Sequence, residues 1–140
     1  MSKPPVSIRP RNELACVAGP RDQPLLLTTV PGFLAATVAR HPAHEAAVFC
    51  AAGIRWRYDE LAEKVDQLAA GLLALGLYKG DRIGIWSPNR PEWLIAQLAT
   101  ARIGLILVNI NPAYRRAELE YALNKVECRA LITAAGREPA

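Results

Sequence analysis

The stretch "RIGIWSPNRPEWLIAQLATARIGLILVNI", residues 82–110, decides the fold class of this chain. It opens with a short apolar run at 82–86, which predicts a strand, and a Ser/Pro/Asn turn follows. A helix is expected after the turn, to about Ile103. The apolar run "LILVNI" at 105–110 then predicts a second strand, of the kind that a parallel sheet buries on both faces.

The turn between the first strand and its helix is a place where α/β proteins often bind phosphate, because helix N-terminal amides favour an anion. Neither GxGxxG nor GxxxxGK[ST] occurs in the 140 residues, and Pro88 and Pro91 have no amide hydrogen. Trp93 adds bulk, and Ser87 or Asn89 can cap the helix. We therefore predict a capped corner and not a nucleotide site.

Downstream, strand and helix continue to alternate. A helix is predicted after "NPAY", with an apolar stripe formed by Leu119, Ala122, Leu123 and Val126, and "RALIT" at 129–133 predicts the last strand. The spacing suits right-handed parallel crossovers. The predicted fold class is therefore α/β, with a β-α-β-α-β parallel-sheet layer.

An extended arm, a short helix, a hairpin and a longer helix are predicted upstream of this layer. Residues 1–27 are Pro-rich and aperiodic, and Thr28 or Thr29 can cap a helix that ends at "RHP". The hairpin is expected as strands 46–51 and 54–57 around Ala52–Gly53. The longer helix carries a repeating apolar face and ends at Gly76, the face being formed by Leu61, Val65, Leu68, Leu72 and Leu75.

Composition excludes several functional classes. The net charge of +4 is mild and the charges are interspersed, which argues against a nucleic-acid partner. No apolar run reaches the roughly 20 residues of a membrane span. Cys16, Cys50 and Cys128 form neither a disulfide framework nor a zinc motif. We expect a cytoplasmic protein, with the mitochondrial matrix as the alternative because the N-terminus carries arginines.

No residue is predicted to be catalytic, cofactor-binding or metal-binding. For each candidate, a structural role is favoured over a functional one. His41 and His44 are expected on the surface of a loop, Ser87 has no GxSxG context, and Cys50 and Cys128 are expected to be core thiols. The remaining candidates are expected to be packing residues, Trp56, Trp86 and Trp93, and a solvated helix face, Asp59, Glu60, Glu63 and Asp66.

The order of motifs nonetheless resembles a known family. "YDEL" (58–61), "GDRIGIW" (80–86), "NRPEW" (89–93), "ARIGLILVNINPAY" (101–114) and "ELEYAL" (118–123) are similar to the N-terminal part of acyl-adenylate-forming enzymes, the AMP-binding superfamily. Within it the chain looks most like medium- to long-chain fatty-acyl-CoA synthetases. The resemblance covers roughly residues 14 to 133, including "PLLLTTV" at 24–30.

This resemblance implies a parent that joins a fatty acid to ATP, with magnesium, and then passes the acyl group to coenzyme A. The family's TSGTTGxPK phosphate loop is absent, so none of its catalytic or cofactor residues can be placed here. We expect residues 1–27 to be an arm, 28–133 a partial N-terminal subdomain and 134–140 an atypical tail, since "AAGREPA" departs from the family. The chain alone is expected to be inactive and to hold no cofactor.

Two further points follow from the comparison with the family pattern. The family usually has Thr where Arg57 stands, and loss of that cap would cost about 1 kcal/mol. The alternative function is a non-catalytic α/β module that pairs with another chain, as a homodimer or with a partner that completes the sheet. A flavodoxin-like or receiver-like domain is a weaker alternative, because the predicted strands end without carboxylates.

Overall fold

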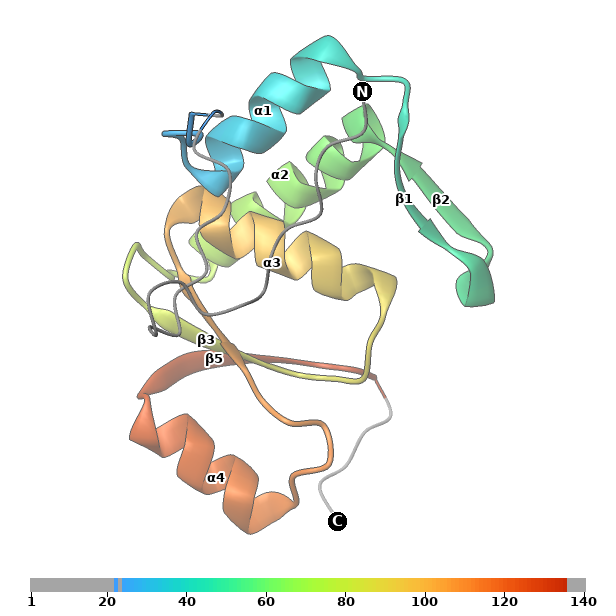
Figure 1. The fold of residues 1–140 in the computed structure, drawn as a ribbon. Helices are drawn as coiled ribbons and strands as arrows, with labels where there is room; N and C mark the ends of the chain where they lie inside the picture. The colour runs from blue at the N-terminus through green and yellow to red at the C-terminus, as the bar shows by residue number, and fades with distance from the viewer. Residues whose placement is uncertain (1–21, 23, 136–140) are drawn as a thin grey trace, which may run out of the picture.

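The computed structural model of the 140-residue chain describes residue 22 and residues 24–135. Its elements are, in chain order, α1 (Val30–Arg40), β1 (Glu45–Phe49), η1 (Cys50–Ala52), β2 (Ile54–Arg57), α2 (Tyr58–Ala74), β3 (Arg82–Trp86), α3 (Pro91–Ile103), β4 (Ile106–Asn109), α4 (Arg116–Lys125) and β5 (Cys128–Thr133) (Figure 1). The predicted arm at 1–27 lies largely outside the described residues.

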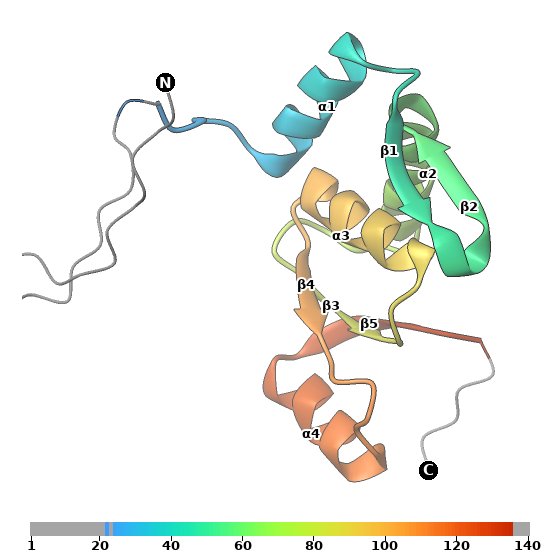
Figure 2. The same cartoon turned by 45° about the vertical axis from the view of Figure 1, so that its right-hand side comes forward.

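Three parallel strands form the sheet that carries the second half of the chain, in the order β4-β3-β5. Both pairings of β3 are parallel, with Gly84 opposite Val108 on one side and Leu131 on the other. The chain steps from β3 to β4 in one direction across the sheet, and from β4 to β5, on the other side of β3, in the opposite direction. Right-handed crossovers therefore place the connecting helices α3 and α4 on opposite faces of the sheet. Figures 1 and 2 show α3 on one face and α4 on the other. The predicted α/β class and parallel order are confirmed.

The centre of the sheet is β3 and not the more apolar run at 105–110. Residues from Ile83 to Trp86 are all buried. Ile106 is 51% exposed, because β4 is at an edge of the sheet in the part of the chain that is described. The prediction that "LILVNI" is buried on both faces is therefore wrong for this chain. Apolar composition marked a strand correctly, but its position in the sheet depends on the order of pairing.

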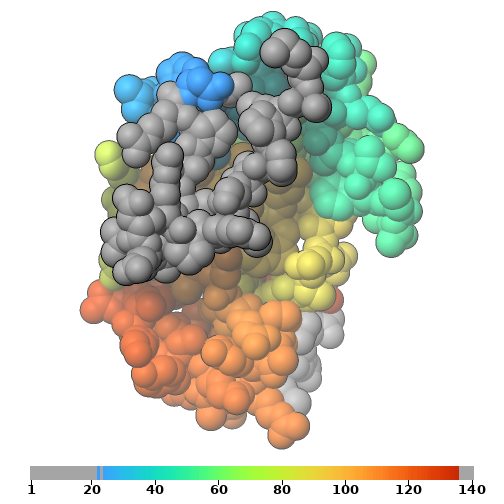
Figure 3. Space-filling view, viewed as in Figure 1, coloured from blue at the N-terminus to red at the C-terminus, as the bar shows by residue number. Residues whose placement is uncertain are grey.

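One apolar core lies between the sheet and the helices α2 and α3, and another lies between the sheet and α4. Ile83 packs with Leu72 and Leu77 in the first. Trp86 packs with Ile110 and Leu119 in the second. In Figure 3, α4 and the segment before it form the lower end of the molecule, away from α1 and the hairpin.

The long helix α2 has the predicted buried face. Leu61, Val65 and Leu72 are each at most 4% exposed. Leu75 was predicted to extend this face and is instead 76% exposed, because it is the C-cap residue and the helix has ended. Gly76 adopts φ +78°, and its N–H donates to the Leu73 carbonyl, which confirms it as the helix stop.

The start of α2 retains half of a capping box although Arg57 replaces the hydroxyl residue. The Arg57 N–H donates to Oε2 of Glu60 at 2.8 Å. A guanidinium has no acceptor, so it cannot return the bond, and the Glu60 N–H donates instead to Oδ1 of Asp59 at 2.8 Å. Asp59 thus replaces part of the missing cap.

The hairpin is shorter than predicted. β1 and β2 pair antiparallel, but η1 occupies residues that were assigned to the first strand, and Gly53 closes the turn at φ +64°. Its Trp56 packs edge-on against Phe49, with ring centroids 5.3 Å apart. At the start of α1, the Thr29 hydroxyl accepts from the Gly32 N–H at 3.2 Å, so Thr29 and not Thr28 is the cap.

Candidate functional site

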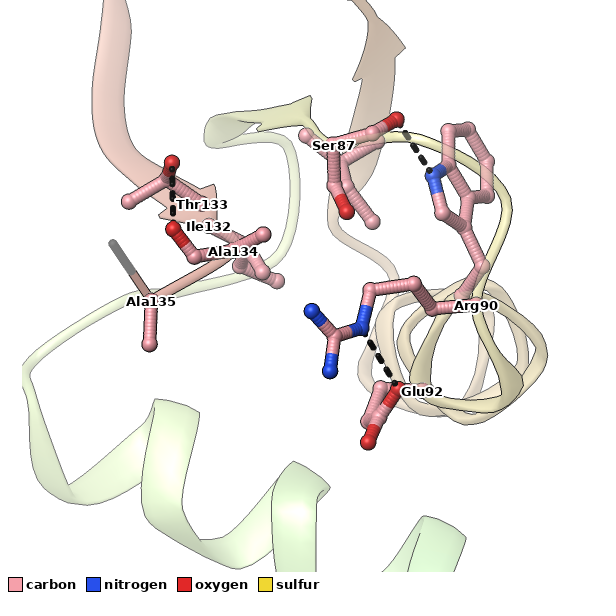
Figure 4. A pocket seen from close by; sticks show the side chains of 9 residues that line it. Ser87, Arg90, Glu92, Ile132, Thr133, Ala134 and Ala135 are labelled. Carbon is pink, nitrogen blue, oxygen red and sulfur yellow. Dashed lines mark hydrogen bonds and ion pairs between the residues drawn. The ribbon is translucent and has the colours of Figure 1, made fainter. Parts of the chain in front are cut away.

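A hollow of about 240 Å³ lies at the carboxyl ends of the parallel strands β3 and β5 (Figure 4). Two distant segments meet there: the end of β3 with the first turn of α3, and the end of β5. Its walls are formed by Ile85, Ser87, Arg90, Glu92, Trp93, Ile132, Thr133, Ala134 and Ala135. Ligands of open α/β sheets bind at this end of the strands, which makes the hollow the candidate site on geometric grounds.

Internal hydrogen bonds close the turn between β3 and α3. The Ser87 hydroxyl donates to the Pro88 carbonyl at 2.9 Å, and the Ser87 carbonyl accepts from Nε1 of Trp93 at 3.4 Å. The N-cap of α3 is Arg90, in extended backbone and without a side-chain cap. The prediction that Ser87 or Asn89 caps this helix is therefore wrong, because the backbone enters the helix one to three residues later.

The first turn of α3 offers few free amide donors to an anion. Pro91 has none, and the Trp93 N–H already donates to the Arg90 carbonyl at 3.0 Å. Among the described residues that line the hollow, Arg90 is the only cation; it lies 3.5 Å from the Glu92 carboxylate, and the two side chains are 49% and 66% exposed. These described residues stabilise a corner and a partly apolar hollow, and they include no paired acid and base for proton transfer.

The other candidates from the sequence lie elsewhere. His41 and His44 are close, with ring centroids 5.1 Å apart, and both are exposed. Within residues 22 and 24–135, no group of three or more His, Cys, Asp or Glu side chains could hold a metal ion. The two histidines are therefore surface residues, as predicted.

The acidic residues of α2 make structural contacts. Asp66 pairs with Arg102 at 2.6 Å and links α2 to α3, Asp59 pairs with Arg57, and Glu63 accepts from Gln67. The polar face predicted for α2 is confirmed, although Asp66 is an inter-helix contact and not only a solvated carboxylate.

The two described cysteines differ in their surroundings. Cys50 is exposed at the tip of the hairpin, so its prediction as a core thiol is wrong; the 3-10 turn η1 carries it out of the strand. Cys128 is half-buried at the start of β5, and burial raises the pKa of its thiol, against a smaller opposing effect of Arg82. A raised pKa keeps the thiol protonated and unreactive.

The three tryptophans are packing residues, as predicted. Trp86 is 3% exposed, Trp56 lies between Phe49 and the Lys64 ammonium, and Trp93 is half-buried over the turn.

The amino ends of β3 and β5 carry a charged cluster that the sequence did not indicate. Asp81 accepts from the Tyr78 N–H at 2.8 Å and pairs with Arg129 at 3.1 Å, while Arg82 pairs with Glu127 at 2.6 Å. The Tyr78 hydrogen bond, followed by the Arg129 guanidinium, holds the pKa of Asp81 below its ordinary value, against an opposing effect of burial. The two ion pairs join residues 45 and 48 positions apart, so only the sheet order reveals them.

The hollow was not predicted from the sequence, because its walls come from segments that are far apart in the chain, such as those of Arg90 and Thr133. The feature that could have predicted it is that the carboxyl ends of parallel strands meet at one edge of a sheet.

Of the residues that the structure describes, no helix is long and apolar enough to cross a membrane.

Comparison with known proteins agrees with this architecture. The model of the "AMP-binding enzyme" family matches residues 34–140. The medium-chain acyl-CoA ligase ACSF2, mitochondrial, of Danio rerio is 50% identical over 116 residues, which are 83% of this chain and 19% of that protein. The acyl-CoA ligase sidI of Aspergillus fumigatus is 41% identical over 118 residues, 84% of this chain and 20% of that protein.

Solved structures give the same result. The N-terminal subdomain of Klebsiella oxytoca NpsA superposes with a TM-score of 0.72 at 30% identity, covering 81% of this chain and 30% of that one. A Mycobacterium tuberculosis fatty acyl CoA synthetase gives a TM-score of 0.73 at 25% identity, covering 76% of this chain and 21% of that one. The chain spans about a fifth of the length of the curated relatives that it matches. It belongs to the AMP-binding enzyme family and corresponds to the N-terminal part of the acyl-CoA ligases in that family.

Proposed function

We propose that this chain is the N-terminal part of an ATP-dependent fatty-acid–CoA ligase. Such an enzyme joins a fatty acid to ATP, with release of pyrophosphate, and then transfers the acyl group from the adenylate to the thiol of coenzyme A. The observation that carries the proposal is the 50% identity to a medium-chain acyl-CoA ligase over 83% of the chain. Magnesium would accompany the ATP.

Within that reaction, we assign the 140 residues a scaffolding role. The hollow at the carboxyl ends of β3 and β5 is lined largely by apolar atoms and by one rim ion pair, which supports packing over chemistry. Its 240 Å³ is also below the roughly 300–1,000 Å³ of typical ligand pockets. The residues that bind ATP, magnesium and coenzyme A belong, on this proposal, to the remaining four fifths of the enzyme.

Domain boundaries and location follow from the same proposal. Residues 28–133 are, on this proposal, a partial N-terminal subdomain and 1–27 its arm. The family match extends to residue 140, so the expectation that 134–140 departs from the family is not kept. The word "mitochondrial" in the names of the ACSF2 relatives supports the matrix over the cytoplasm as the site of action. A fusion of the chain to a fluorescent protein would separate the two locations.

An exchange of segments tests the function. The 116 matched residues of the Danio rerio ligase are replaced by the corresponding residues of this chain, and acyl-CoA formation is measured with a medium-chain acid such as octanoate. We expect the chimera to keep activity within about tenfold of the parent, because a scaffold of the same fold leaves the reacting groups in place.

The 140-residue chain alone is the matched comparison, and it should catalyse no ATP–pyrophosphate exchange. A chimera that folds with the thermal stability of the parent but forms no acyl-adenylate would contradict the proposal. Activity of the short chain alone would contradict its scaffolding role.

A further inference from the structure

We propose that His41 and His44 form a surface site for one divalent transition-metal ion of the zinc, nickel and copper class, held by the two imidazoles and by water. The inference is independent of the proposed ligase function, because it concerns the turn between α1 and β1 and not the carboxyl ends of the parallel strands. Its chemistry also differs from that of the magnesium that accompanies ATP. Magnesium prefers oxygen ligands, whereas imidazole suits Zn²⁺, Ni²⁺ and Cu²⁺.

The separation of the two rings is the first observation that supports a shared ion. The ring centroids of His41 and His44 lie 5.1 Å apart, with an angle of 74° between the ring planes. With about 2.0–2.1 Å between metal and nitrogen and about 90–110° between ligands, two imidazoles on one ion have centroids about 4.5–5.2 Å apart. The observed pair lies within that range. Ligation therefore requires rotation of exposed side chains and no change in the position of the backbone.

The turn that carries the two histidines is fixed by backbone hydrogen bonds on both sides. The His41 N–H donates to the Thr37 carbonyl at 2.9 Å, at the end of α1, and the His44 N–H donates to the His41 carbonyl at 3.2 Å. The Pro42 and His44 carbonyls accept from amides in the first turn of α2, at 3.1 and 3.0 Å. The turn joins α1 to β1 and lies beside the start of α2 (Figure 1). A fixed turn keeps the rings together without the ordering cost that a flexible segment incurs on binding.

The surface position of the pair determines what kind of site it is. Both histidines are exposed, so an ion and its water ligands reach the rings without any opening of the fold. Within residues 22 and 24–135, no group of three or more His, Cys, Asp or Glu side chains could hold a metal ion, so water supplies the other ligands. Glu45, next to His44, pairs its carboxylate with Arg55 at 2.5 Å. The site is therefore reversible, unlike a structural zinc site with four protein ligands.

The charges around the turn do not oppose a cation. His41 is the C-cap residue of α1, and the carbonyl groups at the end of a helix favour positive charge. Arg40 directs its guanidinium back along α1, where Nε donates to the Ala36 carbonyl at 3.2 Å. The start of α2 has the opposite polarity, but Asp59 and Glu60 lie in its first turn and offset it.

Nuclear magnetic resonance of the untagged 140-residue protein tests the site, because the sequence contains two histidines. Zn²⁺ is titrated while the Cε1–H signals of the two imidazoles are followed. We expect both signals to shift together, with one dissociation constant and one ion per chain, while Mg²⁺ at the same concentrations leaves both unchanged. Two signals that move with separate dissociation constants would overturn the inference.

Two variants and a matched control identify the ligands. His41→Ala and His44→Ala should each weaken Zn²⁺ binding at the remaining histidine about tenfold or more, because the second ligand is lost from the same chain. Cys50→Ser is the control, since the exposed Cys50 thiol also has affinity for Zn²⁺, and it should leave the histidine shifts unchanged. A histidine variant that leaves the affinity of the other histidine unchanged would show that the two imidazoles do not share an ion.

Thermal unfolding separates a site made by the fold from one made by the sequence alone. An ion that binds the folded turn better than the unfolded chain raises the thermal midpoint, and a tenfold excess of free Zn²⁺ over the dissociation constant should raise it by about 5 °C. The double variant, His41→Ala with His44→Ala, cancels any effect of the cysteines and should not show this rise. Equal midpoint shifts in the two proteins would overturn the role assigned to the turn.

Discussion

Gly84 lies in the central strand where an added methyl group would meet three apolar side chains, and Gly84→Ala tests this packing directly. A methyl group there would lie 2.9 Å from Cδ1 of Ile110, 3.0 Å from Cδ1 of Leu131 and 3.2 Å from Cδ2 of Leu123. Ordinary contacts between carbon atoms are about 3.5–4.0 Å. The side chains of Ile110 directly after β4, Leu131 of β5 and Leu123 of α4 must therefore all move to admit one methyl group.

The expected magnitude is a balance of two effects. Overpacking of this kind typically costs about 1–3 kcal/mol. Replacing glycine by alanine also restricts the unfolded chain, which favours the fold by about 0.4–1 kcal/mol. The net destabilisation should be about 1–2 kcal/mol, or a fall of about 1 M in the urea midpoint at a slope near 1.5 kcal/mol/M.

Urea unfolding followed by tryptophan fluorescence is the assay, because Trp86 belongs to the affected cluster. Gly71→Ala is the matched control: it lies within α2 with nothing within 4 Å of the added methyl, so it should stabilise by about 0.5–1 kcal/mol. Leu131→Ala should reduce the cost of Gly84→Ala, since it removes one of the clashing atoms. A Gly84→Ala protein as stable as the parent would refute the reasoning.

Two further changes test the polar contacts. The pKa of Asp81 is lowered in the fold, so its contribution to stability should be complete above the ordinary value of about 3.9 and be lost as the pH falls through the lower folded value. Asp81→Asn should therefore flatten the thermal midpoint between about pH 5 and pH 2, and an unchanged profile would contradict the assignment. Glu60→Ala removes the acceptor of the Arg57 N–H and should cost about 1 kcal/mol in urea unfolding, whereas Glu63→Ala, on the exposed face of the same helix, should cost less than half of that; equal costs would show that the half-box does not cap α2.

Local patterns in the sequence were sufficient for the class of fold and for the α-helices and strands, although not for the 3-10 turn η1. The apolar spacing of Leu61, Val65 and Leu72 predicts the buried face of α2, because a helix repeats every 3.6 residues wherever it packs. Gly76 as a helix stop and Thr29 as a cap are equally local, since each depends on hydrogen bonds within a few residues. The order of the sequence motifs was also sufficient to predict the family.

What the sequence could not supply was the position of each strand in the sheet. "LILVNI" is more apolar than "RIGIW", yet in the described sheet β4 is at an edge and β3 is central, because the second crossover places β5 on the far side of β3. The hollow between Arg90 and Thr133 and the cluster of Asp81 with Arg129 depend on that order alone. Helix and strand formation are decided by contacts between near neighbours in sequence. Strand order, and with it the candidate site, is decided by pairing between residues more than 20 positions apart, which only the tertiary structure brings together.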